Sequence, residues 1–283
     1  MTSDRLIDGQ MAFFITEDCG QDSPLLSPIT LCCATAESCD PLESGAGERQ
    51  QRVPGFSQEA LSNLTVLLVG AGAMGGEIAE GLVRKGVGTL KILDFDTVAL
   101  SNLNRQFFFK EDLYNPKSLA LARNLKPHGF MGTRIIAWNL SFEQACEEQV
   151  ELDCGVVISA VDDGRTRVAI SRFARERRIP ALFGGAATTA DFAQLLVQEV
   201  DGPCFGCAFP DEVGGERNLC PGSPAIKDLF KGLAWLALYA VDSLIMDRPR
   251  YWNLHTLCPS EATFTESSMV ERRADCPLCG GDE

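Results

Sequence analysis

The stretch LTVLLVGAGAMGGEIAEGLVRKGVGTLKILDFDTVALSNLNRQFFF, residues 64–109, decides the fold of this 283-residue chain. It begins with an apolar run, 64–69, that passes directly into a glycine loop. The three glycines of this loop are Gly70, Gly72 and Gly75. A stretch with the apolar faces of a helix follows, and a second apolar run ends at Asp94, 22 positions after Gly72. This order of strand, glycine loop, helix, strand and acid is that of a dinucleotide-binding fold.

The residues around this motif indicate which ligand it binds. The glycines let backbone N–H groups approach a phosphate at a helix N-terminus, and the Asp94 carboxylate can accept hydrogen bonds from ribose hydroxyls. The segment after Asp94 is not typical of a dehydrogenase, because a dense polar cluster stands where nucleotide phosphates are expected. The cluster consists of Ser101, Asn102, Asn104, Arg105 and Gln106.

The remaining sequence predicts an α/β fold. We expect a lead-in helix within 49–63 and later helices at 116–125, 141–149, 165–178 and 225–246. Strands are expected at 133–138, 154–160, 180–185 and 192–200, the last of them antiparallel. Alternating helices and strands of this length predict a doubly wound, mainly parallel, Rossmann-like sheet with an antiparallel extension. Residues 1–48 have no clear period, so we expect a small appendage or arm followed by one domain over 49–283.

Composition restricts location and partners. The chain is 45% hydrophobic and 23% charged, as in soluble globular proteins. No apolar run approaches the roughly 20 residues that span a bilayer, and the N-terminus lacks the features of a signal peptide. We therefore expect a cytoplasmic protein without a membrane partner. The formal net charge of −14 argues against a general nucleic-acid binder.

Two C-x-x-C pairs are the clearest metal-binding pattern among the twelve cysteines. The pairs are Cys204 with Cys207 and Cys276 with Cys279. Four thiolates can hold one zinc ion tetrahedrally, at Zn–S distances of about 2.3 Å, and leave no open position. The sequence therefore predicts a structural zinc knuckle that ties the C-terminal tail to the domain. Four cysteines of the N-terminal segment, Cys19, Cys32, Cys33 and Cys39, have no recognisable metal-binding spacing.

The nucleotide motif carries a family resemblance. DFDTVALSNLNRQFFF after GAGAMGGE resembles the nucleotide loop of the ubiquitin-activating-enzyme superfamily, which contains the ThiF, MoeB and HesA proteins. The resemblance runs from about Arg49 to the C-terminus, with several motifs in the family's order. Members adenylate the C-terminal glycine of a ubiquitin-fold protein. The resemblance thus implies ATP and Mg²⁺ as cofactors, and a ubiquitin-like or sulfur-carrier partner. A conjugating enzyme or a sulfur donor would be the next partner.

The segment AVDDGRTR, 160–167, resembles the family motif A-x-D-N-x-x-x-R, whose aspartate handles Mg²⁺ and the ATP phosphates. This implies that role for Asp162 and places Arg167 at the motif's arginine. Asp163 replaces the usual asparagine, and an ionised carboxylate cannot donate a hydrogen bond. The alternative is that Asp162 only caps the next helix. Lys117, after Pro116, resembles the family lysine that contacts the phosphates.

Two further residues have roles implied by the resemblance. The segment RQQRVPGF resembles the family lead-in whose arginine reaches the neighbouring subunit's nucleotide, which implies a homodimer with Arg49 acting across it. A solvated arginine is the alternative. Cys220 follows Glu216, Arg217 and Asn218 in a loop where some members carry a cysteine that accepts the activated partner as a thioester. The alternative for Cys220 is a spectator thiol.

The sequence therefore predicts an ATP-dependent adenylyltransferase. ATP would lie over the glycine loop with Asp94 on the ribose, and the residues around its phosphates would be Asn102, Arg105, Gln106 and Lys117. Alternatives are an adenylating enzyme that tailors a ribosomal peptide, an NAD-dependent oxidoreductase and a catalytically silent scaffold. His128 and His255 stand in no catalytic motif, so we expect them to be surface or packing residues.

Overall fold

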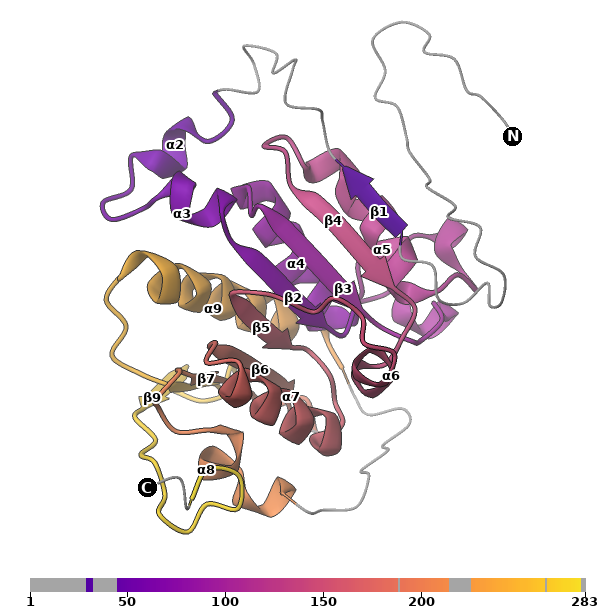
Figure 1. The fold of residues 1–283 in the computed structure, drawn as a ribbon. Helices are drawn as coiled ribbons and strands as arrows, with labels where there is room; N and C mark the ends of the chain where they lie inside the picture. Colours follow the sequence, from indigo (N-terminus) through magenta and orange to yellow (C-terminus); the bar gives the residue numbers. More distant parts are fainter. Residues whose placement is uncertain (1–28, 33–44, 188, 214–224, 263, 281–283) are drawn as a thin grey trace, which may run out of the picture.

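The computed structural model describes residues 29–32, 45–187, 189–213, 225–262 and 264–280. In this part of the chain one sheet has the strand order β1-β4-β3-β2-β5-β6-β7-β8-β9 (Figure 1). The strands are β1 Ile29–Cys32, β2 Thr65–Val69, β3 Thr89–Leu93, β4 Arg134–Trp138, β5 Val156–Ser159, β6 Ala181–Ala186, β7 Ala193–Gln198, β8 Leu254–Leu257 and β9 Thr265–Ser268. The five strands from β4 to β6 are parallel, and β1, β7, β8 and β9 pair antiparallel.

Helices cover both faces of the sheet. They are α2 Glu48–Gln51, α3 Gln58–Ser62, α4 Ala73–Lys85, α5 Lys117–Leu125, α6 Phe142–Glu147, α7 Gly164–Glu176, α8 Phe205–Ala208 and α9 Lys227–Met246. Short 3₁₀ turns are η1 Leu100–Asn102, η2 Lys110–Asp112, η3 Lys126–His128 and η4 Pro210–Glu212. The predicted α/β fold, with its parallel centre and antiparallel extension, is confirmed.

Two apolar cores explain why the central strands read as continuous apolar runs. In β2, Val66 and Leu68 pack into a core with α4, α5 and α9, whereas Leu67 and Val69 pack into a second core with α6, α7 and α8. A parallel strand covered on both faces needs apolar side chains at every position. Strand order reverses between β2 and β5, so a crevice for ligands is expected beyond the carboxyl ends of these two strands.

Helix α9 is long and apolar enough, by length and composition, to cross a membrane, and half of its apolar window is buried. The expectation that no segment reaches that length was therefore wrong for this helix. In the structure Leu233 and Ala237 of α9 are fully buried, and the helix packs against α4 and β7. Its apolar side chains thus build the core that holds the sheet.

Three strands were not predicted from the sequence. Strand β1, from the N-terminal segment, pairs with β4 so that Ile29 is opposite Ala137. Strands β8 and β9 extend the other edge through a pairing in which Leu254 lies opposite Ser268. Part of the predicted appendage therefore belongs to the common sheet. The domain boundary near residue 48 stays a prediction.

Candidate nucleotide site and cysteine cluster

The glycine loop between β2 and α4 combines tight packing with one open position. Gly70 has φ +100°, and a Cβ there would lie 2.6 Å from the Ala160 carbonyl oxygen. A Cβ on Gly75 would lie 2.0 Å from the Gly70 carbonyl oxygen. Gly72 is the N-cap of α4, and a Cβ there would meet nothing within 4 Å. The loop is therefore packed from behind and open at Gly72, where a phosphate can approach the helix N-terminus.

Asp94, at the end of β3, holds this loop in place. Its Oδ2 accepts a hydrogen bond from the Ala71 backbone N–H at 2.6 Å, and its Oδ1 accepts one from Asp96 N–H at 2.8 Å. Burial raises the pKa of the Asp94 carboxyl, and the charge of Lys117 and the two N–H donors oppose that rise. Each carboxylate oxygen can accept a second bond. The predicted ribose contact is thus compatible with a bracing role that the sequence did not predict.

Lys117 lies at the start of α5, directly after Pro116, and its side chain is buried. Its Nζ donates to Asp96 Oδ2 at 2.7 Å, and its backbone N–H donates to the Asp96 carbonyl at 2.8 Å. These contacts place the ammonium group beside the carboxyl end of β3. A positive charge there suits a polyphosphate.

Several side chains of the polar cluster after β3 make hydrogen bonds within their own segment. Asn102 Oδ1 accepts from the Ala99 N–H at 2.9 Å and so closes the η1 turn. Arg105 Nη1 donates to the Ser101 carbonyl at 2.7 Å and to Asn104 Oδ1 at 3.0 Å. Gln106 differs, because its side chain is buried and, among the described residues, its Oε1 has no hydrogen-bond partner. A buried acceptor without a donor is costly, so the site favours a ligand that supplies one.

The two neighbouring aspartates after β5 have separate tasks. Asp163 is the N-cap of α7: its Oδ2 accepts from the Thr166 N–H at 2.9 Å and from Thr166 Oγ1 at 2.8 Å. Asp162 is exposed at the carboxyl end of β5, the strand that pairs with β2. The helix-capping alternative therefore applies to Asp163. It leaves the Asp162 carboxylate at the crevice near the glycine loop.

Arg167 makes hydrogen bonds to the backbone of the turn between β5 and α7. Its Nε and Nη2 donate to the Val161 carbonyl at 3.2 and 2.9 Å, and its Nη1 lies 3.3 Å from Glu212 Oε2. Because Val161 immediately precedes Asp162, Arg167 positions the backbone that carries the predicted magnesium-handling carboxylate.

Asn139 is a further candidate site residue, which the sequence did not single out. It follows β4, its Oδ1 is buried, and no described group donates to this oxygen. The preceding residue, Trp138, accepts a hydrogen bond at 3.4 Å from the backbone N–H of Asp94. Asn139 therefore lies at the same sheet edge as the expected ribose. A polar residue directly after an apolar strand, as with Asp94 and Asp162, was the pattern that could have identified it.

The other predicted residues have simple outcomes. Arg49 is exposed on α2, whose neighbouring Gln50 Nε2 donates to the Lys85 carbonyl at 2.9 Å. Cys220 and Arg217 lie outside the described residues. Both histidines are packing residues, as expected. His255 Nδ1 lies 2.9 Å from Ser267 Oγ, and the His128 ring packs edge-on against Phe107.

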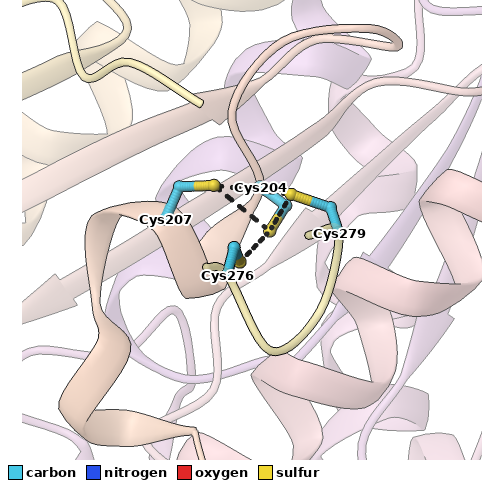
Figure 2. Close-up of side chains that lie close together, drawn as sticks. All are labelled: Cys204, Cys207, Cys276 and Cys279. Atoms are coloured by element: carbon cyan, nitrogen blue, oxygen red, sulfur yellow. Dashed lines mark hydrogen bonds between the residues drawn. The ribbon is translucent and has the colours of Figure 1, made fainter. Parts of the chain in front are cut away.

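The two C-x-x-C pairs meet in one buried cluster (Figure 2). All four sulfur atoms lie within 4.8 Å of one another. Cys204 Sγ is 3.8 Å from Cys207 Sγ, 3.5 Å from Cys276 Sγ and 3.4 Å from Cys279 Sγ. A tetrahedron of sulfurs around a metal at about 2.3 Å has edges of about 3.8 Å. The cysteine cluster therefore has the donor set and the spacing of a closed tetrahedral metal site.

The thiol pKa values in the cysteine cluster shift in different directions. Burial raises the pKa of the Cys204 thiol, and the thiols of Cys279 and Cys276 add to this rise. Burial also acts on Cys276, but the backbone N–H groups of Leu278 and Cys279, together with the neighbouring thiols, lower its pKa to about 7. The lowered pKa favours the thiolate form of Cys276 near neutral pH. A bound metal ion would stabilise the thiolate form of the other three cysteines.

Comparison with known proteins gives one family and several relatives. A sequence profile described as the ThiF family matches residues 47–277. The chain is 33% identical over 172 residues to the adenylyltransferase and sulfurtransferase MOCS3 of Caenorhabditis briggsae, covering 59% of this chain and 42% of that protein. It is 32% identical over 179 residues to the sulfur carrier protein ThiS adenylyltransferase of Bacillus subtilis, covering 60% and 52%. The chain thus spans about half the length of these two relatives.

Solved structures agree at the level of the fold. The chain is similar to E. coli MccB in a crystal structure with MccA-N7isoASN, with a TM-score of 0.68. That similarity covers 79% of this chain and 68% of that one, at 18% sequence identity. At this identity the likeness concerns the arrangement of strands and helices alone.

Proposed function

The chain belongs to the ThiF family, and from this premise we propose that it is an ATP-dependent adenylyltransferase acting on the C-terminal glycine of a ubiquitin-like or sulfur-carrier protein. The observation that carries the proposal is the open position at Gly72, on the N-terminus of α4, between the carboxylates of Asp94 and Asp162. The named activities of the two curated relatives support the same reaction class.

Each residue of the crevice has a task in this reaction. The glycine loop would bind phosphate through backbone N–H groups, and Asp94 would accept a bond from the ribose. Asn139 is suited to the adenine, since an amide can both accept from the 6-amino group and donate to a ring nitrogen. Lys117 would contact the phosphates together with the polar side chains that follow β3. These are Asn102, Arg105 and Gln106.

Asp162 would hold Mg²⁺, which when bound neutralises phosphate charge. The partner's terminal carboxylate then attacks the α-phosphorus of ATP in line, a new P–O bond forms, and pyrophosphate leaves. Positioning and charge neutralisation provide most of the rate enhancement in such a step. Arg167 contributes indirectly, because it fixes the turn that carries Asp162.

The cysteine cluster is proposed to bind one structural Zn²⁺. Four buried thiols at tetrahedral spacing suit zinc, and the closed donor set leaves no place for a reacting water. The metal would connect α8 to the C-terminal turn and thereby hold the C-terminal segment on the domain. We further propose a cytoplasmic homodimer in which Arg49 of one subunit reaches the nucleotide of the other.

The fate of the adenylate is a separate question. Sulfur delivery to the carrier, transfer to a conjugating enzyme and thioester formation on Cys220 are each compatible with the residues. Tailoring of a ribosomal peptide is the alternative with the same first step. An NAD-dependent oxidoreductase is less well supported, because the arginine, glutamine and asparagine cluster suits phosphates better than a nicotinamide.

ATP–pyrophosphate exchange tests the proposal. We expect exchange that depends on Mg²⁺ and on a small protein ending in glycine, with no binding of NAD by calorimetry. A chain that binds NAD and supports no exchange is an oxidoreductase-type protein. A chain that binds ATP and the carrier without any exchange is a silent scaffold.

A further inference from the structure

A cavity of about 200 Å³ lies one strand away from the candidate nucleotide site and has no task in the reaction above. It is lined by the end of β6, the start of β7, α8 and η4, and it opens to solvent. Four aromatic rings form its apolar walls: Phe183, Phe192, Phe205 and Phe209. The Phe205 ring centroid lies 5.0 Å from that of Phe183 and 5.1 Å from that of Phe209. Such contacts fix these three rings, so this part of the wall is preformed, whereas Phe192 is exposed.

The polar side chains that line the cavity already have hydrogen-bond partners within the protein. Arg167 bonds the Val161 carbonyl and Glu212, and its Nη2 donates to the Gly184 carbonyl at 3.4 Å. Gln194 Nε2 donates to Thr256 Oγ1 at 3.1 Å. The lining therefore combines aromatic rings with polar groups that already have hydrogen-bond partners. The Glu212 carboxylate, whose side chain is 38% exposed, adds negative charge at the rim. An aromatic or aliphatic group can pack against the rings, and an acidic group is repelled.

One residue of the cavity wall also contacts the turn that leads to the proposed site of adenylyl transfer. Arg167 joins its wall to Val161, which directly precedes Asp162. On the other face of β6, a Cβ on Gly184 would lie 2.2 Å from Met74 Sδ in the first turn of α4, the helix that begins at the glycine loop. An extended polypeptide whose terminal carboxylate meets the α-phosphate advances about 3.3 Å per residue. Its preceding residues therefore pass within reach of the cavity.

The size of the cavity limits what it can hold. A cavity of about 150 Å³ lined by apolar side chains binds benzene, whereas sites for whole small molecules are larger than about 300 Å³. A volume of about 200 Å³ therefore matches one aromatic or large aliphatic side chain. We propose, resting on the adenylation reaction proposed above, that this cavity binds an apolar side chain of the polypeptide substrate, a few residues before its C-terminal glycine. The cavity thereby selects among partner tails.

A tail-swapped carrier tests this inference. The probe is a ThiS-type sulfur carrier whose residues before the terminal glycine carry Phe, Ala or Asp at one position at a time, assayed by ATP–pyrophosphate exchange. We expect Phe at one position to raise kcat/KM about tenfold or more over Ala, and Asp to lower it. The Ala187→Leu variant adds volume at the cavity lining and should bring the Phe-to-Ala ratio close to one. The Phe142→Leu variant, altered in the same core but outside the cavity, should keep the preference.

Calorimetric binding of the isolated tail peptides separates this inference from the reaction itself. A Phe preference in binding that Ala187→Leu removes supports the subsite even if no tail supports exchange, a result that would refute adenylation alone. Equal binding and equal exchange of Phe and Ala tails at every position overturn the subsite. A Phe preference that persists undiminished in Ala187→Leu also overturns it, because the preference then arises elsewhere.

Discussion

Two alanine substitutions in the glycine loop should differ in their effects on stability and on ATP binding. Gly75→Ala places a Cβ 2.0 Å from the Gly70 carbonyl oxygen, far inside normal contact distance, so α4 must shift away from the loop. Such overpacking costs about 3 kcal/mol of unfolding free energy. Gly72→Ala meets nothing within 4 Å, and its φ of −75° is accessible to alanine. Its effect on stability should be about 1 kcal/mol or less, since the unfolded chain also loses freedom.

For ATP affinity, Gly72→Ala should have the larger effect of the two substitutions. The open face at Gly72 is where the phosphate must touch the backbone, so a methyl group there should weaken ATP binding about tenfold, or about 1.4 kcal/mol. Urea unfolding gives the stabilities, and calorimetry at a temperature where both variants are folded gives the ATP affinities. If Gly72→Ala binds ATP as tightly as the wild type, the loop is not the phosphate site. If Gly75→Ala is as stable as the wild type, the packing argument is wrong.

Four further predictions concern the remaining candidate residues. Asp162→Ala should abolish pyrophosphate exchange with the fold intact by circular dichroism, whereas Asp163→Ala should lower the unfolding free energy by about 0.5–2 kcal/mol through loss of the α7 cap; normal exchange by the first variant would exclude a catalytic role. Elemental analysis should find one zinc per chain, and Cys276→Ala should lose it together with thermal stability; metal-free wild type purified without chelator would contradict this. Sedimentation should show a dimer, and Arg49→Ala should remain dimeric but lose exchange; a fully active monomer would remove the trans role. Cys220→Ala should retain exchange and lose a thiol-sensitive adduct with the carrier; an adduct that persists in this variant would show that Cys220 is not the acceptor.

The cysteine cluster illustrates what spacing in the sequence can predict. Two C-x-x-C pairs each fix one edge of a tetrahedron locally, so only their meeting had to be supplied by the fold. The central strands were equally predictable, because a strand buried on both faces must be apolar at every position. The glycine loop with Asp94 followed from the same kind of local rule, since each of its parts has a steric or hydrogen-bonding reason at a fixed offset.

Other features depend on contacts between distant segments. Strand β1 exists through pairing with β4, about a hundred residues away, and β9 through pairing with β8 at the far edge. Edge strands such as these are half covered, so they need no continuous apolar run and leave little trace in the sequence. The tasks of Arg167 and Asn139 were likewise hidden, because each is defined by the neighbours that the fold brings to it.

Sequence alone therefore determined the fold class, the glycine loop between strand and helix, and the two cysteine pairs that the structure brings together, all of which rest on short-range periodicity or spacing. Tertiary structure decided which of two adjacent aspartates caps α7 and which is exposed, because that choice depends on where the chain turns after β5. It also decided that four phenylalanines from β6, the start of β7 and the α8 segment line one cavity. No local sequence pattern specifies such a cavity. It arises because separate elements pack around a space that none of their side chains fills.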